Sequence, residues 1–180
     1  MLRPRIIPCL LVHNNGLVKT VKFKDPKYVG DPLNAVRIFN EKEVDELMVV
    51  DIDATSHGNE PDHSLIQKLA AECRMPLCYG GGIKTADGAQ YIFSLGVEKI
   101  ALSASAIEKP ELITEIAHRV GNQSVVVVLD VKKKLFGNKY ELFTHNGKKS
   151  SGLDPIEFAK RCETLGAGEV IINSIDQDGT

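Results

Sequence analysis

Short apolar runs alternate along the chain with stretches in which apolar residues recur every three or four positions. The runs predict buried strands at residues 5–12, 46–53, 76–80, 97–103, 124–131 and 168–175. The helical pattern between them covers residues 31–44, 63–74, 85–95, 109–120 and 154–165. Proline near the first turn of some of these helices, and glycine after the end of others, supports the boundaries. This alternation predicts parallel strands joined by right-handed crossovers.

Two architectures have this alternation: an open doubly wound sheet and a (β/α)₈ TIM barrel. The open sheet favours a glycine-rich turn after its first strand, but that turn reads His13-Asn14-Asn15-Gly16, and the glycine run Gly80-Gly81-Gly82 follows the third strand. We therefore predict an α/β fold of the TIM-barrel type, in a single domain over residues 1–180. Eight repeats usually take about 250 residues. The six repeats here predict an incomplete barrel that is part of a longer protein; otherwise the exposed last strand would need a partner.

The composition of the chain argues against several classes of function. The chain has 180 residues, 43% of them hydrophobic, and a formal net charge of -2, which gives no electrostatic case for nucleic acid or an anionic membrane. No apolar run reaches the roughly 20 residues of a membrane span, and the N-terminus lacks a signal-peptide pattern, so we expect a cytoplasmic protein. The four cysteines lack CxxC spacing and indicate reduced, buried thiols. We expect no metal site and no cofactor.

Polar residues and glycines follow the carboxyl ends of the predicted strands, where TIM barrels carry their active sites. Asp130 ends a run of valines, and we favour a catalytic role for it over a capping role. A barrel of two similar halves would place the end of the first strand opposite Asp130. That position holds Leu11, so half of an expected acid–base pair is absent. Asp51 and Asp53 fit a catalytic or a capping role equally well.

The triple glycine and a nearby serine suggest a phosphate site. Backbone N–H groups at Gly81 and Gly82 can approach an anion closely, and Ser103 on the next strand can add a hydroxyl. The long first loop, residues 14–30, could act as a mobile lid that carries Lys19 over the site. We interpret His118 and His145 as surface residues.

Charged residues also begin four of the predicted strands. They alternate in sign and would form a ring at the opposite end of the barrel: Arg5, Glu46, Lys99 and Glu169. Such a ring can be an ion-pair plug that closes the core, or a gate for a small polar molecule.

Several motifs together resemble the cyclase subunit of imidazole glycerol phosphate synthase. They are Arg5-Ile6-Ile7-Pro8-Cys9-Leu10, Gly30-Asp31-Pro32, Asp45-Glu46-Leu47, Gly80-Gly81-Gly82-Ile83 and the stretch from Ser174 to Thr180. The resemblance implies a (β/α)₈ barrel in which ammonia from a glutaminase partner enters through the charged ring. The ammonia then meets a bis-phosphorylated formimino aminoimidazole-carboxamide ribonucleotide at the other end. Cyclisation and cleavage of that substrate give imidazole glycerol phosphate and the aminoimidazole-carboxamide ribotide.

The resemblance also assigns roles to residues. It implies that Asp130, Lys19 and Asp178 are catalytic, and that Gly82 binds phosphate. It further implies that the charged ring is the ammonia gate and that Glu98 faces the glutaminase. The sequence departs from the family pattern at two places, both at the carboxyl ends of the strands. Leu11 replaces the other catalytic aspartate, and Ser103-Ala104 replaces an Asn-Thr pair.

The segment from Gly16 to Pro32 resembles divergent paralogues associated with surface-polysaccharide genes. That resemblance implies a barrel that passes ammonia onward, with a separate amidotransferase, for amidation of an O-antigen sugar. It explains why the ring would persist while the cyclase acid is lost. Two alternatives stay open. One is a working histidine-pathway cyclase in which Asp51 or Asp178 covers for Leu11, and the other is a non-catalytic structural partner of a glutaminase.

Overall fold

The structure, a computed structural model, describes residues 3–134 and 137–180. Six parallel strands form its central sheet in the order β1-β4-β5-β6-β7-β10. Their bounds are β1 Cys9–His13, β4 Leu47–Asp51, β5 Leu77–Gly80, β6 Lys99–Leu102, β7 Val125–Lys133 and β10 Glu169–Ser174. All six predicted strands are confirmed, and so is the parallel pairing. The result is an open, incomplete (β/α)₈ barrel.

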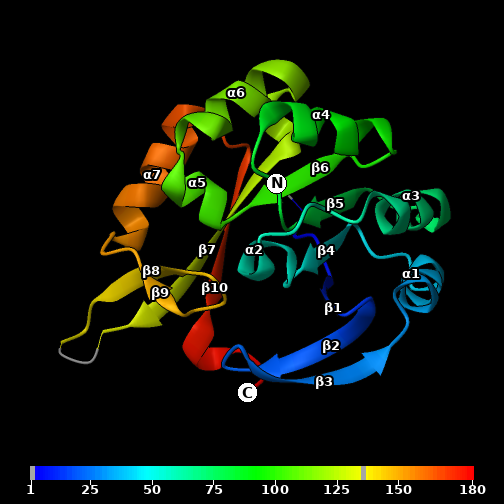
Figure 1. Cartoon of the computed structure of the whole chain (residues 1–180), viewed down its shortest axis with the longest axis horizontal. Coiled ribbons are helices and arrows are strands. Elements are labelled where there is room, and N and C mark those ends of the chain that lie inside the picture. The colour runs from blue at the N-terminus through cyan, green and yellow to red at the C-terminus, as the bar shows by residue number, and fades with distance from the viewer. Residues whose placement is uncertain (1–2, 135–136) are drawn as a thin grey trace.

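The main helices follow the predicted ranges closely. They are α1 Pro32–Glu41, α3 His63–Glu72, α4 Ala86–Ser94, α6 Glu111–Val120 and α7 Pro155–Leu165. Figure 1 shows them following one another around the outside of the strands, from α1 to α7. Side chains cap four of the starts: Asp31, Asp62, Thr85 and Asp154 each accept a backbone N–H of the first turn. No helix in the described parts of the chain is long and apolar enough to cross a membrane.

Two apolar layers result from this arrangement. The larger lies between the outer face of the strands and the helices, and contains fully buried residues such as Ile66, Ile100 and Ile116. The smaller lies on the inner face, where Met48, Cys78, Ala101 and Val126 pack together. Because alternate residues of a strand point to opposite faces, strands buried on both sides read as continuous apolar runs.

Segments between the main elements add structure that the sequence pattern did not predict. Short helices α2 Ala54–His57, α5 Ala104–Glu108, η1 Asn122–Ser124 and η2 Ile175–Gln177 follow strands or the end of α6. Antiparallel strands β8 Tyr140–Thr144 and β9 Lys149–Ser150 extend from β7. The prediction of a loop over residues 14–30 is wrong. That segment is a hairpin of β2 Gly16–Val21 and β3 Lys24–Gly30, and β2 pairs with β1.

Tyr79 has the one buried side-chain polar atom without a hydrogen-bond partner among the described residues. Its side chain is 2% exposed. A buried hydroxyl without a partner costs about 1–3 kcal/mol. We therefore expect Tyr79→Phe to raise the free energy of unfolding by about 1 kcal/mol in urea denaturation. Tyr91→Phe, at an exposed site on α4, is the control and should change nothing. A loss of stability in Tyr79→Phe would show that the hydroxyl is satisfied in solution.

Candidate functional site

A cavity of about 580 Å³ lies inside the strands and joins the two ends of the barrel. Its lining includes Arg5 at one end and Asp130 and Asp178 at the other. The wall between these ends is mostly apolar and is formed by Ile7, Cys9, Met48, Val50, Ala101, Val128 and Ile171. A small neutral molecule can therefore lie in one continuous space between the charged ring and the carboxyl ends of the strands.

The four predicted ring residues form a closed set of ion pairs. Arg5 contacts Glu46 at 3.0 Å and Glu169 at 2.9 Å. Lys99 contacts the same two carboxylates at 2.8 and 2.7 Å. Each cation thus touches both anions, as the alternating charges predicted, and each anion touches both cations.

Electrostatics favour the charged forms of Lys99 and Glu169 in this ring. Burial disfavours the charge on Lys99, but hydrogen bonds to Glu169 and Glu46 outweigh it and raise the pKa of the ammonium group. Burial likewise opposes the charge on Glu169, while the bonds from Lys99 and Arg5 lower the pKa of its carboxyl group. The structure therefore places a charged, hydrogen-bonded constriction at one end of the cavity.

Asp130 lies near the end of β7, at the opposite end of the cavity. Burial raises the pKa of its carboxyl group to about 6, even though Asn173 and Ser103 donate hydrogen bonds that lower it. Asn173 Nδ2 lies 3.0 Å from one carboxylate oxygen, and Ser103 Oγ lies 3.4 Å from the other. The charge of Asp178 raises this pKa further. A carboxyl group that titrates near neutrality can take up and release protons at physiological pH.

Leu11 lines the same cavity from β1, with Val50 and Val18 as its neighbours across the strands. Its side chain cannot exchange a proton. Cys9, two residues earlier, is accessible from the cavity, which departs from the prediction that it is buried. The protein around it and the charge of Asp130 raise the pKa of this thiol to about 11. Neither residue supplies an acid–base group at neutral pH.

The glycine run brings backbone close to the end of β4. A Cβ atom at Gly81 would lie 2.4 Å from the carbonyl oxygen of Asp51, so only glycine allows this approach. Gly81 and Gly82 have positive φ angles of 115° and 72°, and both line the cavity with Ser103. The structure thus brings the three predicted phosphate residues to one wall. Asp51 Oδ1 accepts the N–H groups of Asp53 and Ala54 at 2.8 and 3.1 Å, which is a capping geometry.

Asp178 contacts the β2–β3 hairpin. One of its carboxylate oxygens accepts the hydroxyl of Thr20 at 2.8 Å and the N–H of Phe23 at 2.9 Å. Its backbone carbonyl accepts the N–H of Lys22 at 3.0 Å. Gly179 follows so closely that a Cβ there would lie 2.1 Å from the carbonyl oxygen of Thr20. Asp178 therefore lines the cavity and also holds the hairpin over it.

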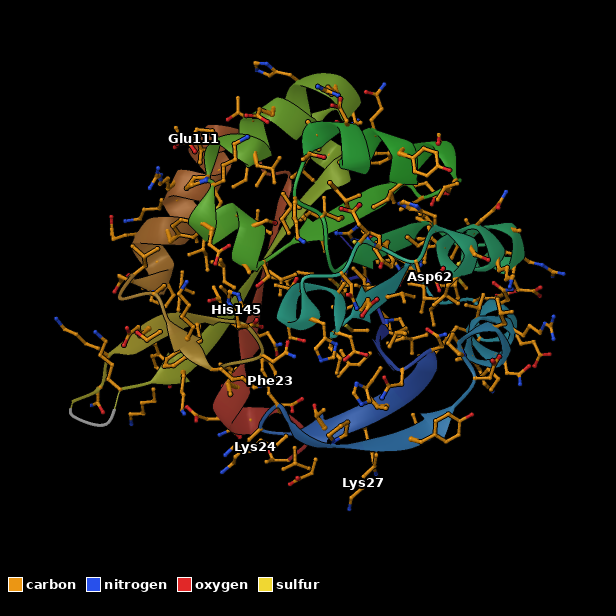
Figure 2. All side chains as sticks on the ribbon, viewed as in Figure 1. Phe23, Lys24, Lys27, Asp62, Glu111 and His145 are labelled. Atoms are coloured by element: carbon orange, nitrogen blue, oxygen red, sulfur yellow. The ribbon has the colours of Figure 1, made fainter. Side chains whose placement is uncertain are left out.

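Two predicted residues lie away from the cavity lining. Lys19 is exposed on β2, opposite Lys27 of β3, and Figure 2 shows Lys27 pointing away from the barrel. Because cross-strand partners share a face, Lys19 points away as well. Glu98 is exposed near the charged ring, and one of its carboxylate oxygens accepts the N–H of Leu77 at 2.8 Å.

The cavity also contains residues that sequence reasoning missed. Thr20 and Phe23 reach it from the hairpin, Asn173 from β10, and His145 and Asn146 from the turn between β8 and β9. His145, predicted to be a surface residue, is partly exposed and also lines the cavity, and His118 is exposed on α6 as predicted. The Asn14-Asn15 pair was a usable signal for the tight turn between β1 and β2, because both residues adopt the positive φ angles of such a turn.

A metal-binding cluster is not present in the part of the chain that the structure describes: no three His, Cys, Asp or Glu side chains converge there. The site therefore consists of one carboxyl group with a raised pKa, a glycine and serine wall, and a cavity that leads to the ion-pair ring.

Comparisons with known proteins show which sequences this chain resembles. The family model described as "Histidine biosynthesis protein" matches residues 5–180. The chain is 62% identical over 179 residues to "Putative imidazole glycerol phosphate synthase subunit hisF3" of Vibrio vulnificus (strain YJ016), covering 99% of this chain and 69% of that protein. It is 59% identical over 180 residues to "Putative imidazole glycerol phosphate synthase subunit HisF" of Leptospira borgpetersenii, covering all of this chain and 71% of that protein. The "hisF2" protein of Pseudomonas aeruginosa PAO1, named in the same way, is 54% identical over 179 residues, 99% of this chain and 71% of its own length.

Proposed function

Because this chain belongs to the histidine biosynthesis protein family, with HisF subunits as relatives, we propose that it is a barrel subunit that conducts ammonia. Ammonia released by a glutaminase partner enters at the ring of Arg5, Glu46, Lys99 and Glu169. It travels through the cavity to a phosphate-bearing acceptor held near Gly81, Gly82 and Ser103. The end use that we propose is amidation of a surface-polysaccharide sugar, with a separate amidotransferase.

One observation carries this proposal. The cavity connects the ion-pair ring to Asp130, while Leu11 occupies the place of the second acid on the wall. Removing one acid–base group typically costs about 10²–10⁴ in rate. A chain that keeps the cavity between the ring and Asp130 but lacks the second catalytic acid is better suited to delivering ammonia than to the cyclase reaction.

The ring supports a gating role. In the structure each cation of the ring bridges both carboxylates, so ammonia can pass only if at least one of these ion pairs breaks. Arg5 is the most exposed of the four, with 45% of its side chain accessible, and can swing away at the smallest desolvation cost. The apolar wall beyond the ring favours neutral ammonia over ammonium, because a charge there would lose its hydration.

The glutaminase partner would dock at the ring end of the barrel. Glu98 is exposed there and can present its carboxylate to a basic surface. Its bond to Leu77 N uses one oxygen and leaves the other available.

A second function, cyclisation in histidine biosynthesis, is favoured by Asp130. Its carboxyl group, with a pKa raised to about 6, fits general acid–base work without its lost partner. The printed names of the relatives point to the same synthase.

Ammonia-driven turnover of the formimino ribonucleotide distinguishes the two functions. We expect no measurable turnover with Leu11 in place and partial activity in Leu11→Asp, because the new carboxylate faces the same cavity as Asp130. Leu11→Asn, which places a side chain of the same shape at the same position of the cavity wall, is the matched control and should stay inactive, since an amide cannot exchange a proton as a carboxylate does. Robust turnover in the natural protein would instead assign it to histidine biosynthesis.

A further inference from the structure

His145 occupies an unusual position for a residue between two short strands. It lies in the turn between β8 and β9, where His145, Asn146 and Gly147 have φ angles of 54°, 55° and 72°. This left-handed run turns the chain back over the barrel, and Asn146 Nδ2 donates to the carbonyl oxygen of Ile52 at 2.9 Å. The turn is thereby anchored to the β4–α2 loop, and His145 lines the cavity beside it.

Neighbouring segments hold this turn in place. Gly147 lies close to Phe23 of the hairpin and to Ile175. Figure 2 shows His145 beneath α5, with Phe23 nearby on the side of β2. The same wall carries Ser103 and Ser105, at the start of α5. His145 therefore shares the cavity with the predicted phosphate residues.

The imidazole ring is oriented with one nitrogen unused. Nδ1 lies 3.0 Å from the hydroxyl of Thr144, a residue that is 2% exposed. Nε2 makes no hydrogen bond among the described residues, and a carboxylate oxygen of Glu108 lies 3.9 Å from it. Glu108 is itself engaged by Lys149 at 3.5 Å. One ring nitrogen of a residue that lines the cavity therefore has no hydrogen-bond partner among the described residues.

The charges of the residues that line the cavity determine which of them can bind an anion. The cavity lining described by the structure carries three carboxylates near the strand ends: Asp51, Asp130 and Asp178. Only two of the lining residues can be cationic. Arg5 is bound in the ring at the far end, which leaves His145 at the strand ends. A phosphate group placed among these carboxylates needs a positive partner.

We propose that His145 is the cationic contact for the phosphate group of the acceptor, together with the backbone of Gly81 and Gly82 and the hydroxyl of Ser103. The inference rests on the proposed function, since it specifies how its phosphate-bearing acceptor is held. An imidazole gains its charge as the pH falls toward about 6, so binding of the anion strengthens in the same direction. The charged groups around the site are Glu108 beside His145, Lys149 beside Glu108, and the three carboxylates that line the same cavity.

Sulfate is the probe for the test, because it keeps two negative charges over the whole pH range in which an imidazole titrates. Calorimetric titration of the intact chain with sodium sulfate, at constant ionic strength, should give affinity about tenfold higher at about pH 6 than at about pH 8. In His145→Asn the affinity at about pH 6 should fall, and only the smaller pH dependence that Asp130 contributes should remain. Asparagine suits this site because it tolerates a positive φ angle and carries no charge.

His118→Asn, on the exposed face of α6, is the control and should behave like the natural protein. Near-ultraviolet circular dichroism checks that both variants are folded. If His145→Asn keeps the full pH dependence, the role of His145 is rejected while the phosphate site stands. If the natural protein binds no sulfate at either pH, the phosphate-bearing acceptor is rejected and the role of His145 with it. Ammonia conduction is tested separately by turnover.

Discussion

Asp130→Asn is expected to make the protein more stable at neutral pH by about 3 kcal/mol, while it abolishes acid–base chemistry in the cavity. Burial raises the pKa of this carboxyl group from 3.8 to about 6, so ionising it works against the folded state. Asparagine has the same shape, can accept the hydrogen bond from Asn173 and can bond to Ser103. It removes the buried charge.

The sign of the pH dependence follows from this shift. Between about pH 4 and about pH 6 the folded protein holds a proton on Asp130 that the unfolded chain has released, so stability falls as the pH rises. Asp130→Asn should lack this decline, and the two proteins should be equally stable near about pH 3, where both carry an uncharged side chain. Urea denaturation at a series of pH values measures both effects.

Asp87→Asn is the matched control for Asp130→Asn. Asp87 is 88% exposed on α4, where it pairs with Arg119. Losing a charge there should leave the stability close to that of the natural protein. If Asp130→Asn instead lowers the stability at neutral pH, then Asp130 is ionised and well paired in solution, and its assignment as a proton carrier is wrong.

Glu46→Gln should destabilise the protein by about 3 kcal/mol, the second large effect that we expect. Glu46 is 3% exposed and takes part in ion pairs with both Arg5 and Lys99. The amide keeps the shape of the side chain but leaves two cations with a single carboxylate, that of Glu169. Removing one partner from a buried ionic group costs more than the pair contributes, because the remaining charges stay desolvated.

Urea denaturation at low and at high salt checks this second prediction. The loss in Glu46→Gln should persist at high salt, because buried charges are poorly screened. Glu72→Gln is the control: it breaks the exposed pair with Arg37 and should leave the transition where it is. Equal effects in the two variants would mean that the ring is hydrated like a surface ion pair.

The fold was predictable because its signals are local. The valine run at residues 125–128 predicts a strand wherever it packs, and Asp31-Pro32 and Asp154-Pro155 mark helix starts through contacts within one turn. The ring was predictable for a related reason. Strand starts in a parallel sheet meet at one end, so four charges of alternating sign had to lie near each other.

The rest of the site depends on contacts between distant segments. The hairpin has Pro26 within a strand and Lys22-Phe23 at its tip, where φ angles of 53° and 61° would favour glycine or asparagine. That conformation is supported by Asp178, far along the chain, and no pattern around residue 22 shows it. His145 was missed for the same reason, since only the course of the β8–β9 turn brings it to the cavity.

The hydrogen bonds between Asp178 and the β2–β3 hairpin can form only late in the synthesis of residues 1–180. Thr20 and its acceptor Asp178 are separated by 158 positions, so the ribosome completes the hairpin long before it makes the residue that holds it. Until Asp178 emerges, the left-handed tip at Phe23 lacks the hydrogen bonds that the carboxylate and the carbonyl group of Asp178 supply. The hairpin tip therefore reaches its final hydrogen bonding only after translation has passed residue 178.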